Sequence, residues 1–212
     1  LDSRPMSEYH AMNIPLGVDV PGAELVLRVH DLAPDPATTV VVNCAGRTRS
    51  IIGCQSLRNA GIPNKVIALE NGTMGWHLAG FDLEYGNTRQ YGNLSSDGLS
   101  VAMQRAADVR ERFGVKSIDA DTLAAWQADT TRTTYVFDGR DPTEFAAAHI
   151  KGARPAPGGQ LVQATDRYVG TLGARIVCVD DNGVRATMTA SWLVQIGWDA
   201  VILEPGAIPM NE

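Results

Sequence analysis

Short runs of apolar, often β-branched residues alternate along the chain with segments of helical periodicity. Such short runs predict buried strands, and strands separated by helices are typical of a mainly parallel sheet with helices on its faces. We therefore predict an α/β fold. The expected strands are residues 40–43, 66–69, 115–118, 135–138, 175–179 and 200–203, and a short helix is expected at residues 121–127, capped by Asp119 or Asp121.

One longer segment has a helical pattern with a single apolar face. Gly114 follows it and is expected to end the helix, while the polar, turn-rich residues 86–98 before it predict an exposed connection. The apolar positions recur at spacings of three and four: Leu99, Ala102, Met103, Ala106, Val109 and Phe113.

The chain contains an internal repeat with an offset of 136 residues. Residues 1–25 align without gaps on residues 137–161, and residues 41–50 align on residues 177–186 at the same offset. The identical pairs include Asp2/Asp138, Arg4/Arg140, Glu8/Glu144, Ile14/Ile150, Pro21/Pro157, Gly22/Gly158 and Leu25/Leu161. The repeat predicts two homologous domains.

We place these domains at residues 1–86 and 115–212, with a linker and connecting helix at 87–114. The first repeat begins partway through its first predicted strand, whereas the second is preceded by a strand and a helix. We therefore expect roughly 20 further residues of the first domain, and room for further domains, upstream of Leu1.

Composition narrows the function classes. The 212 residues are 44% hydrophobic and 20% charged, as in ordinary globular proteins, and no apolar run approaches the roughly 18 residues of a membrane span. A net charge of −6 disfavours nucleic acid and anionic membrane surfaces as partners. Three cysteines are too few for a disulfide scaffold, so we expect a reducing, cytoplasmic location.

The most informative segment is residues 40–61, in which Cys44 follows a predicted strand and a helix begins near Ser50 and ends at Gly61. A strand-to-helix turn offers unpaired N–H groups to an anion, and Arg47 and Arg49 add positive charge. We expect a reactive thiolate that faces its loop and is reachable from water. A strand-end cysteine that merely fills core space is the alternative.

This segment resembles the rhodanese family of sulfurtransferases, whose members have a six-residue loop beginning with the catalytic cysteine. Residues 44–49, CAGRTR, supply such a loop, and Ser50 opens the helix. Two flanking stretches also resemble the family, although Asn13 and Leu16 depart from its pattern. The matching residues are Asp2, Arg4, Glu8, Ile14 and Pro15 in the first stretch, and Leu69, Gly72, Trp76 and Gly80 in the second. We interpret Asp2, Arg4 and Glu8 as structural.

The resemblance implies two rhodanese-like domains and a double-displacement reaction without metal or cofactor. Cys44 would take sulfur from thiosulfate or a similar donor as a persulfide and pass it to a thiol or cyanide. Arg49 would close the loop on the anionic donor, and Arg47 would project toward solvent. The implied substrate-binding residues are Ala45, Gly46, Arg47, Thr48, Arg49 and Ser50.

Two alternatives to this enzyme remain open. Related phosphatases and arsenate reductases use a C-x5-R loop around a tetrahedral oxyanion, whereas Cys44 and Arg49 form the shorter C-x4-R, which suits a sulfur atom. A non-catalytic sulfur-carrying or regulatory module would keep the same loop without turnover.

The second repeat has Asp180 at the position of Cys44, and a carboxylate cannot carry sulfane sulfur. We expect Asp180 to occupy its own amide-lined loop or to meet Arg185. Cys178 lies inside a predicted strand and Cys54 on a predicted helix, so both are interpreted as core residues. The four histidines show no metal-ligand spacing.

Overall fold

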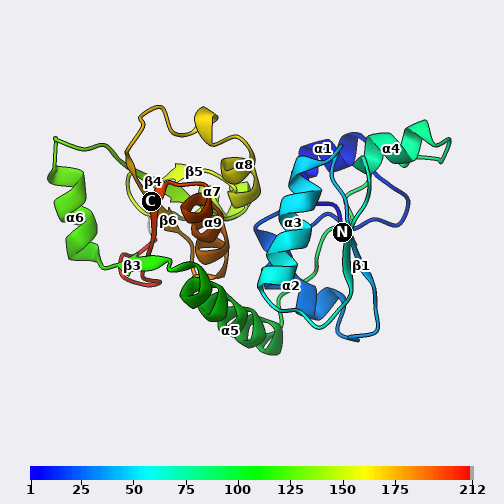
Figure 1. Cartoon of the computed structure of the whole chain (residues 1–212), viewed down its shortest axis with the longest axis horizontal. Helices are drawn as coiled ribbons and strands as arrows, with labels where there is room; N and C mark the ends of the chain where they lie inside the picture. The colour runs from blue at the N-terminus through cyan, green and yellow to red at the C-terminus, as the bar shows by residue number, and fades with distance from the viewer. Residues whose placement is uncertain (211–212) are drawn as a thin grey trace. The chain divides into compact units, whose positions relative to one another are not determined.

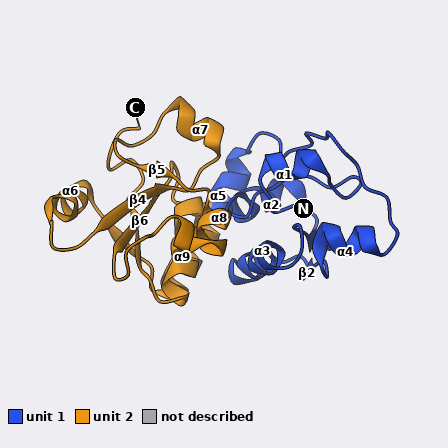
Figure 2. Ribbon diagram, turned by 90° about the horizontal axis from the view of Figure 1, so that it is seen from above, with its two compact units in different colours: residues 1–102 blue, residues 103–212 orange. Residues whose placement is uncertain are grey.

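The computed structural model describes residues 1–210 and divides into two compact units, Leu1–Ala102 and Met103–Glu212. Figure 2 shows the two units in different colours. The division falls inside one helix, α5 (Ser96–Phe113). No helix in the described part of the chain is long and apolar enough to cross a membrane.

The first unit is built around two parallel strands, β1 (Val40–Val42) and β2 (Val66–Ala68). Single parallel bridges add Asp2 beside Asn43 and beside Asp19. Figure 1 shows α3 beside α2 in this unit. The helices are α1 (Met6–Ala11), α2 (Glu24–Leu32), α3 (Thr48–Asn59) and α4 (Gly72–Leu78).

The second unit contains a five-stranded, fully parallel sheet in the order β3-β7-β6-β4-β5. The strands are β3 (Lys116–Ile118), β4 (Thr134–Asp138), β5 (Arg154–Pro155), β6 (Arg175–Val179) and β7 (Asp199–Leu203). The helices are α6 (Ala120–Ala128), α7 (Pro142–Ala147), α8 (Gly158–Gln163), α9 (Val184–Gln195) and the short 3-10 helix η1 (Thr165–Arg167).

Helices cover both faces of this sheet because successive strand residues point to opposite sides. Ile176 and Cys178 of β6 belong to a core cluster with residues of α8 and α9. Val177 and Val179 belong to a second cluster with residues of α6 and α7. The result is the three-layer arrangement expected for a buried parallel sheet, and Figure 1 shows α6 on one side of the strands and α8 and α9 on the other.

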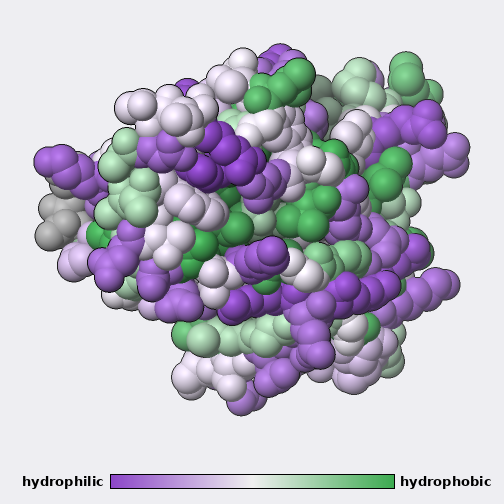
Figure 3. All heavy atoms as spheres, turned by 60° about the vertical axis from the view of Figure 1, so that its left-hand side comes forward, coloured by the Kyte–Doolittle hydropathy of each residue, from purple (hydrophilic) through white to green (hydrophobic). Residues whose placement is uncertain are grey.

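The predicted fold class is confirmed, and the differences from the predicted elements are small. Gly114 ends α5 with a φ of +65°, and the Asp119 side chain caps α6 by accepting from Thr122 N. The helix after the cysteine loop begins at Thr48, two residues before the predicted Ser50. On the face of the molecule in Figure 3, hydrophilic residues cover most of the surface and apolar residues form small groups.

The internal repeat is preserved in the buried ion pairs. Arg4 donates from Nε and Nη2 to the two carboxylate oxygens of Asp2, at 2.9 and 2.7 Å. Arg140 makes the equivalent contacts with Asp138, and in both units the guanidinium also binds a main-chain carbonyl, of Met12 or Ala148. These contacts support a structural role for Asp2 and Arg4, since they occur identically in the unit without the loop cysteine.

Candidate active site

Cys44 lies at the carboxyl end of β1, where the chain turns into α3. Its side chain is only 2% exposed, so the thiol is more enclosed than the water-accessible thiolate expected from the sequence. It does not face away from the loop, however. The thiol donates to Ser50 Oγ over 3.5 Å, and the Ser50 hydroxyl donates to Arg47 O at 2.9 Å, so sulfur and hydroxyl lie on the inner side of the turn.

The outer side of the loop is bound by the amino end of α4. Cys44 O accepts hydrogen bonds from Thr73 N at 2.8 Å and Thr73 Oγ1 at 3.1 Å, and Ala45 O accepts from Met74 N at 3.0 Å. In a trans peptide the C=O of one residue and the N–H of the next point in opposite directions. The Ala45 and Gly46 N–H groups therefore point away from α4, which leaves them for the side of the loop opposite α4.

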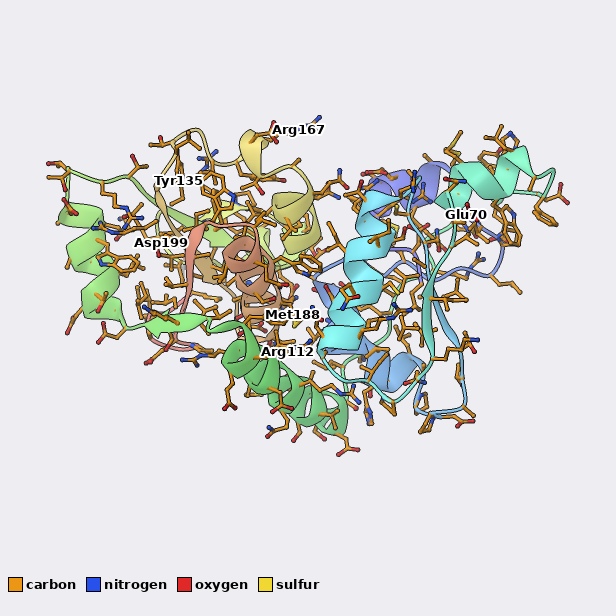
Figure 4. All side chains as sticks on the ribbon, in the orientation of Figure 1. Glu70, Arg112, Tyr135, Arg167, Met188 and Asp199 are labelled. Carbon is orange, nitrogen blue, oxygen red and sulfur yellow. The ribbon has the colours of Figure 1, made fainter. Side chains whose placement is uncertain are left out.

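Gly72 permits this close approach. Its φ is +56°, and a Cβ at this position would lie 2.2 Å from Cys44 O. A side chain would therefore both strain the backbone and collide with the loop. Figure 4 labels Glu70, which lies two residues before Gly72 in the turn between β2 and α4. The family-like pattern around Leu69 and Gly72 marked this segment in the sequence but gave no sign of its contact with the loop.

Asn43 extends this network beneath the loop. It is 5% exposed, and its Nδ2 donates to Asp2 Oδ2 at 3.0 Å and to Thr73 Oγ1 at 3.3 Å. Sequence reasoning missed Asn43 and Thr73 as members of the site. The available signal was a polar amide at the buried end of an apolar strand, immediately before the cysteine.

Arg49 is held by a carboxylate of its own unit. Its Nη1 and Nη2 donate to the two oxygens of Glu8 at 2.6 and 2.7 Å, and these hydrogen bonds hold the pKa of Glu8 below its ordinary value. Arg49 is 9% exposed and Glu8 40%. The sequence interpretation of Glu8 as purely structural did not foresee this contact with the loop, and a role for Arg49 in donor binding stays a prediction.

The other predicted loop residues surround the cysteine. Ala45 and Gly46 are half-buried, Arg47 and Thr48 are exposed, and Ser50 is buried. Arg47 occupies the N-cap position of α3 without a side-chain capping bond. The loop thus brings residues 44–50 together at one helix start, with one exposed cation beside them.

The second loop is filled by its own carboxylate. Asp180 is 4% exposed, and its two oxygens accept hydrogen bonds from Gly183 N at 2.7 Å and Ala186 N at 3.1 Å. Burial raises the pKa of Asp180 to about 6, although these N–H groups act to lower it. Arg185 binds Glu144 at 2.6 and 3.1 Å, the counterpart of the contact between Arg49 and Glu8.

The remaining cysteines lie in the core. Burial is the main cause that raises the pKa of Cys178 to about 12, and the nearby Asp180 charge adds to it. Burial likewise raises the pKa of Cys54, which is 5% exposed on α3. Within residues 1–210, no group of three or more His, Cys, Asp or Glu side chains is arranged to hold a metal ion.

Two parallel sheets flanked by helices, with a cysteine loop at the end of a strand, define the class of this protein. The chain belongs to the rhodanese-like domain family, whose model matches residues 1–79 and 119–207. The crystal structure of a thiosulfate sulfurtransferase from Pseudomonas aeruginosa is 54% identical to the chain, with a TM-score of 0.94. The match covers 100% of this chain and 42% of that chain, so the sequence spans less than half of its relative.

Other solved structures are more distant. The 3-mercaptopyruvate sulfotransferase SseA from Escherichia coli is 18% identical over 93% of this chain and 83% of its own, with a TM-score of 0.35. The reduced CoADR-RHD protein from Bacillus anthracis is 20% identical over 50% of this chain and 18% of its own, with a TM-score of 0.41. No curated protein sequence matches the chain.

Proposed function

We propose that the chain is a thiosulfate sulfurtransferase whose nucleophile is Cys44. The observation that carries the proposal is the loop geometry: the carbonyls of residues 44 and 45 are bound to α4, which turns the Ala45 and Gly46 N–H groups the other way. The 54% identity to a thiosulfate sulfurtransferase over the full length of this chain supports the same activity.

In the first half-reaction, the Cys44 thiolate attacks the outer sulfur of thiosulfate. The new bond joins Sγ to that sulfur, the S–S bond of thiosulfate breaks, and its electron pair leaves with sulfite. Thiolate and thiosulfate carry three negative charges together, as do the Cys44 persulfide anion and sulfite. In the second half-reaction, cyanide attacks the outer persulfide sulfur, which forms thiocyanate and restores the Cys44 thiolate.

Positive potential in the loop suits these anions. The start of α3 contributes its helix dipole, the Ala45 and Gly46 N–H groups contribute hydrogen-bond donors, and the exposed Arg47 contributes a full charge. The charge of Arg49 is largely neutralised by Glu8. We therefore assign Arg49 two roles, to hold the loop in place and to bind the donor. Thr48 and Ser50 supply hydroxyl groups at the same helix start.

The burial of Cys44 favours a small donor and a small acceptor. Cys44 is 2% exposed, and its C-x4-R loop is one residue shorter than the C-x5-R loop that surrounds a tetrahedral phosphate. The shorter loop therefore leaves less room for a bound substrate. This favours sulfur transfer over phosphate ester hydrolysis. A module that carries sulfur without turnover would show the same persulfide and is separated from the enzyme only by kinetics.

The direct test is intact-mass measurement of the chain after thiosulfate, followed by peptide mapping. We expect one added sulfur on Cys44, none on Cys54 or Cys178, and thiocyanate formation with cyanide that is lost in Cys44→Ser. A persulfide without turnover would assign the chain to the carrier class. Modification of Cys178, or hydrolysis of an aryl phosphate, would overturn the proposal.

A further inference from the structure

The two units differ in one buried feature beneath their loops. In the first unit Asn43 and Thr73 form a polar contact, and both side chains are at most 5% exposed. Thr73 donates from both its main-chain N and its hydroxyl to Cys44 O. The side-chain hydrogen bonds of this pair join the two residues to each other, to Cys44 O and to the buried Asp2.

The second unit has apolar residues at the same two places. The pairing of Val42 with Ala68 corresponds to that of Cys178 with Ile202, so Asn43 corresponds to Val179. Thr73 lies five residues after Ala68, and Ala207 lies five residues after Ile202. Val179 and Ala207 belong to or pack against an apolar core cluster, and Ala207 N donates to Glu204 O.

This difference is informative because buried polar groups weaken a core unless they are fully paired, whereas apolar residues of similar size do not. In the second unit Val179 and Ala207 take these two positions, and the Asp180 loop still forms with its carboxylate bound to Gly183 N and Ala186 N. The loop fold itself therefore does not need the amide and the hydroxyl. Of the two units, only the one whose loop carries the cysteine has this buried polar pair, Asn43 and Thr73.

We propose that Thr73 and Asn43 are positioning residues for sulfur transfer at Cys44, an inference that rests on the proposed function. Thr73 fixes the Cys44 carbonyl with two donors, which fixes the direction of the Ala45 N–H on the other side of the same peptide group. Asn43 donates to Thr73 Oγ1 and leaves the hydroxyl proton to bind Cys44 O. Asn43 and Thr73 thereby hold the Ala45 N–H in place as a hydrogen-bond donor for the thiolate and the persulfide.

Thr73→Val tests this, because it removes the hydroxyl and keeps the shape. We expect single-turnover persulfide formation at saturating thiosulfate to fall about ten-fold, the effect of one lost hydrogen bond to the loop, with little change in the thiosulfate concentration for half-maximal rate. Thr73→Ser is expected to restore the rate to within about two-fold.

The matched control is Thr189→Val in the second unit. The Thr189 hydroxyl is also buried and also donates to a main-chain carbonyl, that of Arg185, at 2.8 Å. It should lower thermal stability as Thr73→Val does while leaving the rate unchanged. Equal rates in Thr73→Val and wild type, or equal rate losses in Thr73→Val and Thr189→Val, would overturn the proposal.

Asn43→Val, which copies the second unit, gives a second measurement if Thr73→Val folds poorly. Because Asn43 acts through Thr73, the double variant should lose less than the product of the two single losses, and independent losses would contradict the proposal. The rate of Cys44 alkylation by iodoacetamide gives a readout without thiosulfate. If wild type fails to accept sulfur, the proposed function is wrong. In that case slower alkylation of Cys44 in Thr73→Val still supports the positioning role, and unchanged alkylation refutes it.

Discussion

Replacing Glu8 by Gln should loosen the start of α3 without disturbing the second unit. Glu8 and Arg49 join α1 to the cysteine loop through two hydrogen bonds of 2.6 and 2.7 Å. Gln offers Arg49 a single neutral oxygen, so one charge-assisted bond is lost while the 9%-exposed guanidinium remains enclosed.

The expected size of the effect is about 1 kcal/mol. Hydrogen bonds to charged groups contribute about 1.5–3 kcal/mol when buried, but Glu8 is 40% exposed and solvent screens part of the interaction. A loss of about 1 kcal/mol corresponds to about five-fold faster opening-limited exchange of the α3 amides.

The effect should depend on pH in one direction. Arg49 lowers the pKa of Glu8 below its value of 4.5 in the unfolded chain, so the folded state releases this proton more readily. The contribution to stability is therefore complete above about pH 4.5 and lost as the pH falls through the folded pKa. Wild type and Glu8→Gln should converge in acid.

Hydrogen exchange with peptide-level mass analysis measures this change at α3 and at α9 in the same sample. The matched control, Glu144→Gln, should affect α9 and not α3, and its effect should be smaller because Arg185 also binds Asp181 at 2.7 Å. Unchanged exchange of the α3 amides in Glu8→Gln would refute the reasoning. So would a difference between wild type and Glu8→Gln that persists undiminished in acid.

Two further substitutions test the two loops. Gly72→Ala should destabilise the first unit by about 2 kcal/mol or more, because the φ of +56° at Gly72 and the 2.2 Å approach to Cys44 O leave no place for a Cβ. Thermal unfolding measures this loss, and an unfolding midpoint equal to that of wild type would contradict the placement of α4. The raised pKa of Asp180, about 6 against 3.8 in the unfolded chain, means that the folded state holds this proton more tightly, so stability of the second unit should fall by roughly 3 kcal/mol as the pH rises from about 3 to 7. Urea unfolding at several pH values should show this fall in wild type and not in Asp180→Asn, and identical profiles would rule out Asp180 as its source.

Local patterns in the sequence were sufficient for the fold class and for the place of Cys44 between a strand and a helix. Apolar runs located the strands, the repeat indicated two rhodanese-like regions, and the offset of 136 residues identified Asp180 as the sequence equivalent of Cys44. The expectation that Asp180 occupies its own loop amides is borne out by its bonds to Gly183 N and Ala186 N, because a carboxylate at a helix start has donors within its own turn.

The contacts that shape the cysteine loop were not predictable in this way. Glu8 and Arg49 are 41 residues apart, and Thr73 binds a carbonyl 29 residues before it. Periodicity reports which positions are buried, but it does not report which distant polar groups meet once they are buried. The start of α3 at Thr48 instead of Ser50 has the same cause, since the helix start depends on the turn rather than on an apolar stripe.

The carboxylate in the second loop also bears on what that loop can exchange with its surroundings. Asp180 is covalently attached beside the donors that it satisfies, so its effective concentration there is fixed by the chain and cannot be diluted. A dissolved sulfite or thiosulfate ion could bind there only by displacing the Asp180 carboxylate, whose negative charge would then need another partner. The Asp180 side chain, which cannot dissociate, thus prevents small anions from binding to the second loop.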